Sequence, residues 1–314
     1  MNFVQYKNGN YDVYIDLDTG TKIRKNDLDF FEASTVESMD IKITNMCNMG
    51  CPMCHENSTI DGKHGDILSS SFLDNLHPYT ELAIGGGNVL EHPDIDEFLK
   101  RCKDRKFICN ITVNQKHFIE SFNRIKNWVD NRLVYGVGVS LNKPSHELVK
   151  LMHFIPNSVL HVIAGLVSLE DLEFLSMNNL KVLVLGYKQV RRGKDLYNTY
   201  MHNSIDYRID TLKNNIRNIL DNKWFNVVSF DNLAIKQLDI KNILSNEQWE
   251  EFYMGDDGQD GKQTSASMFV DMVERKFARN SCAPENERYN ILDNVEDMYK
   301  FLKDNSKHVI NSEV

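Results

Sequence analysis

Three cysteines lie within eight residues of one another near the start of the chain, a spacing suited to binding metal. They belong to the segment Cys47-Asn48-Met49-Gly50-Cys51-Pro52-Met53-Cys54, which follows the short run Ile41-Lys42-Ile43-Thr44. Six cysteines scattered over 314 residues would rarely fall this way. A disulfide would leave one of the three thiols over, so metal binding is the better explanation.

Two kinds of metal centre compete for these thiols. Zinc in a closed structural site takes four nitrogen or sulfur ligands. His55 as the fourth ligand would have to bind beside its neighbour Cys54, which one tetrahedral ion seldom allows. An iron–sulfur cluster normally takes four cysteines, so three imply one iron that is open to another ligand. We favour this open cluster over its alternatives, a structural zinc module and a plain electron-transfer cluster.

The spacing Cys47-x3-Cys51-x2-Cys54, on the loop after a first strand, resembles the motif of radical S-adenosylmethionine (radical SAM) enzymes. The resemblance implies a [4Fe-4S] cluster on the three thiolates, with the amino and carboxylate groups of SAM on the open iron. It implies that an electron, delivered by a donor such as a flavodoxin or ferredoxin, cleaves SAM to a 5′-deoxyadenosyl radical that abstracts hydrogen from a substrate. The resemblance covers about Met39 to Tyr187 and identifies no subfamily.

A glycine-rich turn follows the second expected strand, about thirty residues after the cysteines. Radical SAM enzymes usually have Gly-Gly-Glu-Pro there, whose backbone and acid hold the amino group of SAM. Gly86 and Gly87 match this pattern loosely, and Gly87 or Asn88 stands in the place of the acid. An asparagine carbonyl accepts a hydrogen bond from an ammonium, but without the charge.

The resemblance places further cofactor contacts at the ends of the later strands. These are Asn114 after the third strand, Ser140 and Asn142 after the fourth, Gly165 after the fifth, and Leu185 and Tyr187 after the sixth. Met53 stands where the family prefers an aromatic, and its thioether offers comparable packing against adenine. Each residue alone is more often an ordinary loop position, but together they favour a SAM pocket.

Substrate contacts are expected from polar residues near the same strand ends. The candidates are His55, Glu56, Lys188, Asp231 and Asn232. Ordinary polar residues at the mouth of a barrel would give the same pattern. The segment Arg191-Arg192-Gly193-Lys194 is either an anion clamp or a solvated loop. The sequence identifies no catalytic acid, base or radical relay.

Alternating strand and helix patterns predict the scaffold that positions these residues. Continuous apolar, β-branched runs are typical of parallel strands buried on both faces. They occur at Ile41–Thr44, Leu82–Ile84, Phe107–Val113, Tyr135–Leu141, Val159–Ala164, Val182–Leu185 and Phe225–Phe230. Helical patterns lie between them, at Phe72–Leu76 after the serines 69–71, Pro93–Cys102, Ser145–His153 and Ser168–Met177. The expected fold is α/β, a partial (β/α)6 barrel of incomplete TIM type, with its site at the carboxyl ends of the strands.

The barrel is expected to carry an appendage at each end, giving units of residues 1–38, 39–232 and 233–314. The first contains a β-hairpin, with strands at Tyr11–Leu17 and Thr21–Arg24 around a glycine turn. The last is an α+β extension that covers the opening of the barrel. It contains a capped helix start at Ser245, a strand at Ser267–Val273 and a helix at Val295–Leu302. Its acidic segment Met254–Gly261 is interpreted as a turn, because a calcium loop would end in glutamate.

Charge and composition limit the partners. A net charge of −9, with no basic cluster beyond the short patch 188–194, argues against nucleic acid. We expect a cytoplasmic location, since no signal peptide begins the chain and no run approaches the roughly 18 apolar residues of a membrane span. The scattered Cys102, Cys109 and Cys282 are interpreted as small hydrophobes, not as ligands of a second cluster.

The expected function is hydrogen abstraction from a peptide or protein side chain. The alternatives are a radical SAM enzyme acting on a small metabolite or nucleotide, and an activase that installs a glycyl radical on a partner. The non-enzymatic alternative is a structural zinc or iron–sulfur module. The sequence does not identify the substrate.

Overall fold

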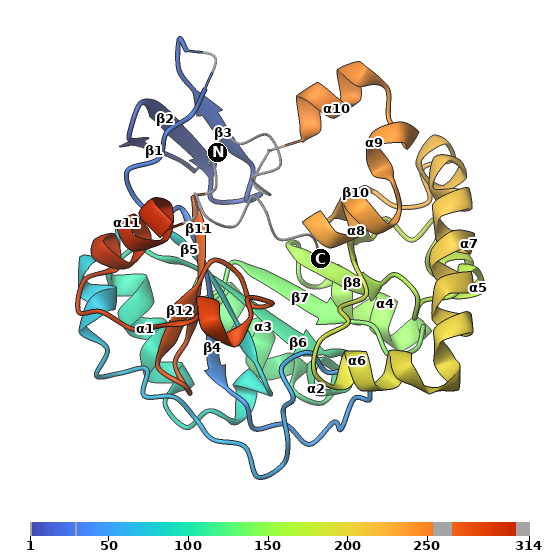
Figure 1. The fold of residues 1–314 in the computed structure, drawn as a ribbon, viewed down its shortest axis with the longest axis horizontal. Coiled ribbons are helices and arrows are strands. Elements are labelled where there is room, and N and C mark those ends of the chain that lie inside the picture. The colour runs from blue at the N-terminus through green and yellow to red at the C-terminus, as the bar shows by residue number, and fades with distance from the viewer. Residues whose placement is uncertain (1, 29, 254–265, 306–314) are drawn as a thin grey trace.

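A ten-stranded sheet forms the centre of the computed structural model, which describes residues 2–28, 30–253 and 266–305 (Figure 1). Its strand order is β10-β9-β8-β7-β6-β5-β4-β11-β12-β13, in which β4 to β11 run parallel and β12 and β13 antiparallel. The strands are β4 Ser38–Thr44, β5 Glu81–Gly86, β6 Ile108–Asn114, β7 Gly136–Ser140, β8 Ser158–Ile163, β9 Lys181–Leu185, β10 Val227–Phe230, β11 Ser267–Asp271, β12 Lys276–Ala278 and β13 Tyr289–Asn290.

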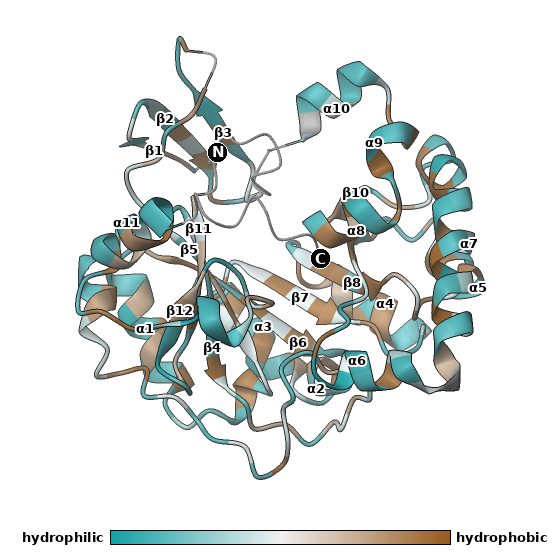
Figure 2. Ribbon diagram, in the orientation of Figure 1, coloured by the Kyte–Doolittle hydropathy of each residue, from teal (hydrophilic) through white to brown (hydrophobic). Residues whose placement is uncertain are grey.

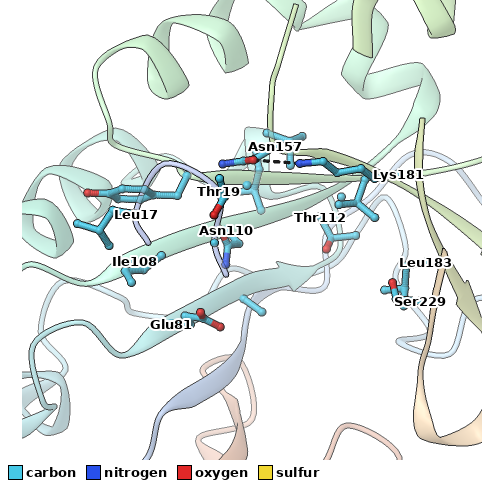
Figure 3. Close-up of a pocket in the computed structure, with 18 of the residues that line it drawn as sticks. Leu17, Thr19, Glu81, Ile108, Asn110, Thr112, Asn157, Lys181, Leu183 and Ser229 are labelled. Atoms are coloured by element: carbon cyan, nitrogen blue, oxygen red, sulfur yellow. Dashed lines mark hydrogen bonds between the residues drawn. The ribbon is translucent and has the colours of Figure 1, made fainter. Parts of the chain in front are cut away.

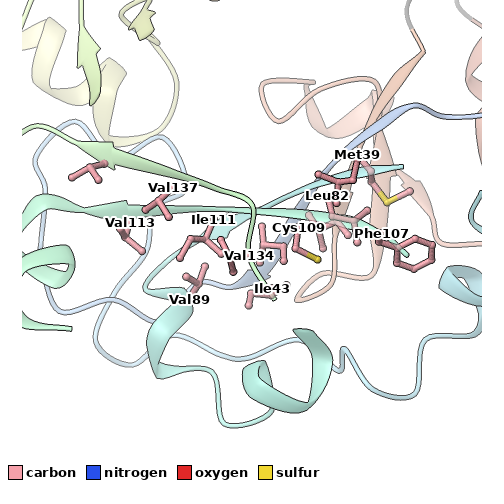
Figure 4. Close-up of a cluster of buried hydrophobic side chains, with 14 of the residues drawn as sticks. Met39, Ile43, Leu82, Val89, Phe107, Cys109, Ile111, Val113, Val134 and Val137 are labelled. Carbon is pink, nitrogen blue, oxygen red and sulfur yellow. The ribbon is translucent and has the colours of Figure 1, made fainter. Parts of the chain in front are cut away.

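The seven predicted parallel strands are all present, but the expected burial of both of their faces holds only in part. One face of the sheet packs under helices, where Met39 and Leu82 are buried with the side chains shown in Figure 4. Successive side chains of a strand point to opposite faces. On the other face Asp40 and Ala83 are exposed, whereas Lys42 is buried. Part of this second face lines a cavity.

Helices connect the strands along the chain. They are η1 Ser71–Asn75, η2 Val89–Glu91, α1 Ile95–Asp104, α2 Gln115–Glu120, α3 Phe122–Asp130, α4 His146–His153, α5 Leu169–Leu175, α6 Arg192–Leu196, η3 Tyr197–Met201 and α7 His202–Asp221. Ser145 and Ser168 cap α4 and α5 with their side chains, as predicted. Ser70 does not cap η1, because its hydroxyl donates to the carbonyl of Asp66 at 2.8 Å.

A small antiparallel sheet precedes the large one, in the order β1-β2-β3. Its strands are β1 Phe3–Asn8, β2 Tyr11–Asp16 and β3 Lys22–Lys25. The predicted hairpin is the β2–β3 pair, and its turn uses Gly20 at a φ of 77°, where a glycine is favoured. The strand β1 was not predicted. In Figure 1 this sheet lies beyond the amino end of β4, and the loop after β4 lies beyond its carboxyl end.

The last part of the chain supplies short helices and one flank of the large sheet. Its elements outside the sheet are α8 Asn232–Gln237, α9 Ile240–Ile243, α10 Asn246–Phe252, η4 Glu285–Glu287 and α11 Val295–Asn305. Ser245 and Gln248 form a capping box at α10, as predicted from the sequence, and the predicted strand and terminal helix are β11 and α11. The predicted turn Met254–Gly261 lies outside the described residues.

Figure 2 shows hydrophobic residues along the strands and hydrophilic ones along the outer side of α7 and over much of α10. Helix α7 is the longest of the chain's described helices, and its buried residues are Ile205, Leu212, Ile216 and Ile219. This helical spacing could have predicted α7, which the sequence analysis missed. No helix in the described residues is long and apolar enough to cross a membrane.

Candidate functional site

The three cysteines lie on the long loop that leaves the carboxyl end of β4. The loop folds back on itself through backbone hydrogen bonds, since the N–H of Cys47 donates to the carbonyl of Thr59 at 2.8 Å. The end of β5 holds it from the other side. There the N–H of Asn88 donates to the carbonyl of Met46 at 2.7 Å. Backbone contacts on both sides therefore fix the position of the first cysteine.

All three thiols are free and half-buried. Burial raises the pKa of the Cys47 and Cys51 thiols, and the nearby Cys54 raises both further. The thiols are thus close enough for a charge on one to act on the others. Holding all three as thiolates requires a positively charged group among them.

This donor set fits an iron–sulfur cluster better than a single ion. Within the described parts of the chain, no three His, Cys, Asp or Glu side chains gather closely enough to hold one metal ion. His55, the candidate fourth zinc ligand, instead points its Nε2 to Glu56, 3.2 Å from Oε1. Cys47, Cys51 and Cys54 are the residues that would hold a cluster, whose several irons spread its thiolate ligands over a larger volume than one zinc ion does.

A buried charge network backs the cysteine loop. Lys42 Nζ lies 3.2 Å from Oε2 of Glu56 and 3.0 Å from Oδ2 of Asp271, and all three side chains are buried. Burial alone would raise the pKa of Glu56. The hydrogen bond and charge of His55, together with Lys42, outweigh that effect and lower it to about 2. Glu56, a predicted substrate contact, is therefore engaged by Lys42 of β4.

The glycines after β5 permit a close approach to the cysteine loop. A Cβ on Gly86 would lie 2.3 Å from the carbonyl oxygen of Thr44, and one on Gly87 would lie 2.2 Å from that of Met46. Gly86 also has a φ of 112°. A side chain at either position would force the two segments apart. Gly85, in contrast, faces open space.

Asn88 is buried and caps η2. Its Oδ1 accepts from the N–H of Leu90 at 3.3 Å, and its Nδ2 donates to Oε1 of Glu91 at 3.1 Å. The sequence analysis missed Glu91, an exposed carboxylate whose charge acts on the Cys47 thiol. The sequence could have indicated Glu91, because it stands in the first turn after the glycines. An acid therefore lies beside the position where the sequence analysis expected one.

The polar residues at the ends of β6 and β7 lie together. The amides of Asn114 and Asn142 exchange two hydrogen bonds of 2.8 Å, and Ser140 pairs with Asn114 in the strand register. His117 of α2 lies near them in sequence and was also missed. Its Nε2 is 2.8 Å from Oδ1 of Asn48, so α2 contacts the cysteine loop directly.

The residues predicted after β8 and β9 are packed against helices. Gly165, at a φ of 85°, would place a Cβ 2.8 Å from Ile205 of α7. Leu185 is half-buried at the end of β9. Tyr187 is buried, and its backbone N–H and carbonyl both bond to the side-chain amide of Gln237, at 2.8 and 3.0 Å.

The remaining candidates occupy different settings. Asp231 caps α8, accepting from the N–H groups of Gly186 at 2.9 Å and Ala234 at 2.7 Å, and Asn232 is the first residue of that helix. Lys188 is half-buried, and its Nζ lies 3.5 Å from Oγ of Ser281. Asp231 thus has structural partners already, whereas the contact of Lys188 with Ser281 is long.

Comparison with known proteins finds likeness in structure and none in sequence. No protein-family model and no curated protein matches the chain. The structure of Streptococcus suis SuiB bound to precursor peptide SuiA matches with a TM-score of 0.59 and 15% identity, over 90% of this chain and 68% of that one. SuiB bound to S-adenosylmethionine matches with a TM-score of 0.58 and 13% identity, over 95% and 87%. The chain has the fold of SuiB.

The sheet borders a cavity of about 410 Å³ on its inner face (Figure 3). Its wall takes residues from β5 to β10, including Asn110, Thr112 and His161, and Thr19 and Gly20 of the β2–β3 turn also line it. Burial lowers the pKa of His161 to about 4, so its imidazole is neutral at pH 7. Sequence reasoning missed this cavity because its wall combines residues of six strands that lie far apart in the sequence.

Proposed function

We propose that this protein is a radical SAM enzyme that modifies a peptide. The observation that carries the proposal is the set of three free, half-buried thiols at the carboxyl end of β4, in a chain with the fold of SuiB. A bound [4Fe-4S] cluster and SAM would supply the one-electron chemistry that removes a hydrogen atom from the substrate. The protein's own residues supply position and exclude water.

The cofactor pocket is proposed at the carboxyl ends of the parallel strands. Cys47, Cys51 and Cys54 hold the cluster, and Glu91 beside Asn88 provides the negative charge that attracts the amino group of SAM. The close packing of the β5 glycines on the cysteine loop keeps that backbone near the cluster. The other cofactor contacts proposed are Met53, Gly86, Gly87, Asn114, Ser140, Asn142, Gly165, Leu185 and Tyr187.

The substrate site is proposed between the cysteine loop and the cavity. Residues of six successive strands line this one cavity, which supports an incomplete barrel curving around it. Its amino end is closed by the β2–β3 turn, so SAM and substrate enter from the carboxyl end. His55, Lys188 and Asn232 are the proposed contacts at that entrance. A closed, dry pocket confines a reactive radical to one position of the substrate.

A peptide is the favoured substrate. SuiB was solved with its precursor peptide, and this chain shares that fold over most of its length. Among the described residues, β10 and β13 are the edges of the large sheet, where an extended peptide can add as a strand. We propose the division of the chain that the sequence predicts. Residues 1–38 close the cavity, residues 39–232 form the barrel, and residues 233–314 complete the substrate site. An electron donor such as a flavodoxin or ferredoxin is the proposed second partner.

Release of 5′-deoxyadenosine tests this function. Anaerobically reconstituted protein is incubated with SAM and dithionite, with and without candidate peptides, and the nucleoside is measured by chromatography and mass spectrometry. We expect slow release that a true peptide substrate accelerates and that C51A abolishes. Release that is stimulated by small metabolites and by no peptide would contradict the peptide assignment. No release under any condition would contradict radical SAM activity.

A further inference from the structure

Two consecutive arginines from the segment between β9 and α6 bind the backbone of the cysteine loop. Arg191 Nη1 donates to the carbonyl of His55 at 2.6 Å, and Arg192 Nη2 donates to that of Ser58. Arg191 has a φ of 48°, in the left-handed region that a non-glycine residue rarely adopts. The strained backbone lets both side chains turn toward the same loop.

The backbone around these arginines is fixed on both sides. The hydroxyl of Tyr187 donates to the carbonyl of Gly193 at 2.8 Å. A Cβ on Gly193 would lie 2.2 Å from the carbonyl oxygen of Lys188 and 3.5 Å from that of Met53. Met53 lies between two of the cysteines, so this segment packs directly on the cluster-binding loop.

Arg192 differs from Arg191 in what its charge faces. The residue after its partner Ser58 is Thr59, whose carbonyl accepts from the N–H of Cys47. The Nε of Arg192 is buried and has no hydrogen-bond partner among the described residues. Since Arg192 bonds Ser58 and the next residue, Gly193, packs against Met53 between Cys51 and Cys54, its guanidinium is held at the loop that carries the thiols.

Arg191 faces a different group. Its Nη1 lies 3.9 Å from Oε2 of the buried Glu56, the carboxylate that also pairs with Lys42. Its charge therefore lies near the buried network of Lys42, Glu56 and Asp271. The two arginines hold the same loop, but the charge of Arg191 faces a carboxylate, whereas Arg192 bonds a backbone carbonyl and has a buried Nε without a partner among the described residues.

We propose that Arg192 is a positioning residue that raises the reduction potential of the cluster held by Cys47, Cys51 and Cys54. This inference rests on the proposed function. Reduction adds one electron to the cluster and forms or breaks no bond, so the reduced cluster is more negative by one charge. A permanent guanidinium charge beside the thiolates favours that form, and net charge and hydrogen bonds near the sulfurs are among the factors that set such potentials.

The test is the midpoint potential of the reconstituted cluster, measured by stepwise reduction with dithionite and electron paramagnetic resonance, with iron and sulfide content measured alongside. R192Q removes the charge and is expected to shift the potential to a lower value. R192K keeps the charge and is expected to stay near the wild-type value. R191Q is the matched control, because it removes a contact to the same loop without removing the charge beside the thiols. It is expected to leave the potential unchanged.

Each result decides the proposal. An unchanged potential in R192Q with full cluster content would overturn it, and so would equal shifts in R192Q and R191Q. If R192Q assembles no cluster, a cluster in both R192K and R191Q would support the need for a positive charge at position 192. Loss of the cluster in R192K would overturn the proposal. A wild-type protein that binds no iron and sulfide would instead contradict the proposed function itself.

Discussion

Cys51 is the middle one of the three proposed cluster ligands, and its loss leaves two thiolates. Two thiolates cannot hold a cluster that also leaves one iron open. We predict that Cys51→Ala loses the iron–sulfur absorbance and SAM cleavage. Cys282→Ala, at another half-buried free cysteine, is the control and should keep both. Full iron and sulfide content in the Cys51 variant would contradict the assignment of the ligands.

Asn88 tests the proposed site for the amino group of SAM. If its carbonyl contributes one neutral hydrogen bond, Asn88→Ala weakens SAM binding by about 0.5–1.5 kcal/mol. Calorimetric titration of the reconstituted protein measures this. Glu91→Gln should weaken binding more, because it removes a charge. The assignment would fail if both variants bound SAM as tightly as the wild type.

At single positions, the sequence located residues at strand ends better than it predicted their side-chain partners. The cysteine spacing and the pair Asn114 and Asn142 follow from local order and from parallel strands ending together. Asp231, in contrast, is a helix cap. The same sequence pattern fits a helix cap and a substrate contact, so it cannot tell the two roles apart. Arg192 contacts a loop 134 residues away in sequence, and no local pattern encodes that distance.

The buried Lys42 joins three elements: β4, the cysteine loop through Glu56, and β11 through Asp271. Removing its charge takes the closest cation from two buried carboxylates and leaves Arg191 near Glu56 and Arg288 near Asp271, each at 3.9 Å. We predict that Lys42→Met lowers the free energy of unfolding by about 3–5 kcal/mol in urea denaturation. Lys116→Met is the control, because the Lys116–Glu120 pair is exposed and is worth no more than about 0.5 kcal/mol. Equal losses in the two variants would contradict the role of the network.

The N-terminal sheet is docked through the buried carboxylate of Glu37. It accepts from Nδ2 of Asn8 at 3.2 Å and pairs with Nη2 of Arg24 at 2.9 Å. Burial would raise the pKa of Glu37, but the charge and hydrogen bond of Arg24 and the hydroxyl of Tyr11 hold it below its ordinary value of 4.5. A lowered pKa means that this stabilisation is present above pH 4.5 and is lost as pH falls through the folded-state value.

We therefore predict that Glu37→Gln destabilises the protein at pH 7 and that its difference from the wild type shrinks as the pH falls below 4.5. Urea denaturation from pH 7 to pH 3 measures this difference. Asp74→Asn, at the exposed Arg105–Asp74 pair, controls for general effects of acid. A difference that stays constant over this range would show that Glu37 does not titrate as its contacts require.

Among the elements, the parallel strands were predictable because each is a compact β-branched run bounded by loops. Helix α7 was missed although its apolar spacing is regular, since its polar residues obscure the pattern. The strand β1 was missed because its residues are mostly half-exposed and pair only with β2. Pairing of this kind depends on a partner and not on a residue's own preference.

At the level of the whole molecule, one cavity lies on the inner face of the sheet, and the β2–β3 turn contributes to its lining. The sequence predicted the strands, but not the cavity, whose wall combines residues from six of them. Asn110 of β6 and His161 of β8 both line it. The neutral His161 shares this wall with the charged residues Glu81 and Lys181.

The central claim is that the three cysteines hold a [4Fe-4S] cluster with an open iron that SAM occupies. The most direct measurement is the electron paramagnetic resonance spectrum of the anaerobically reconstituted, dithionite-reduced protein before and after SAM is added. We predict iron and sulfide in the ratio of a [4Fe-4S] cluster, together with a reduced-cluster signal that changes when SAM binds. A colourless protein that takes up zinc, or a cluster signal that SAM leaves unchanged, would contradict the account.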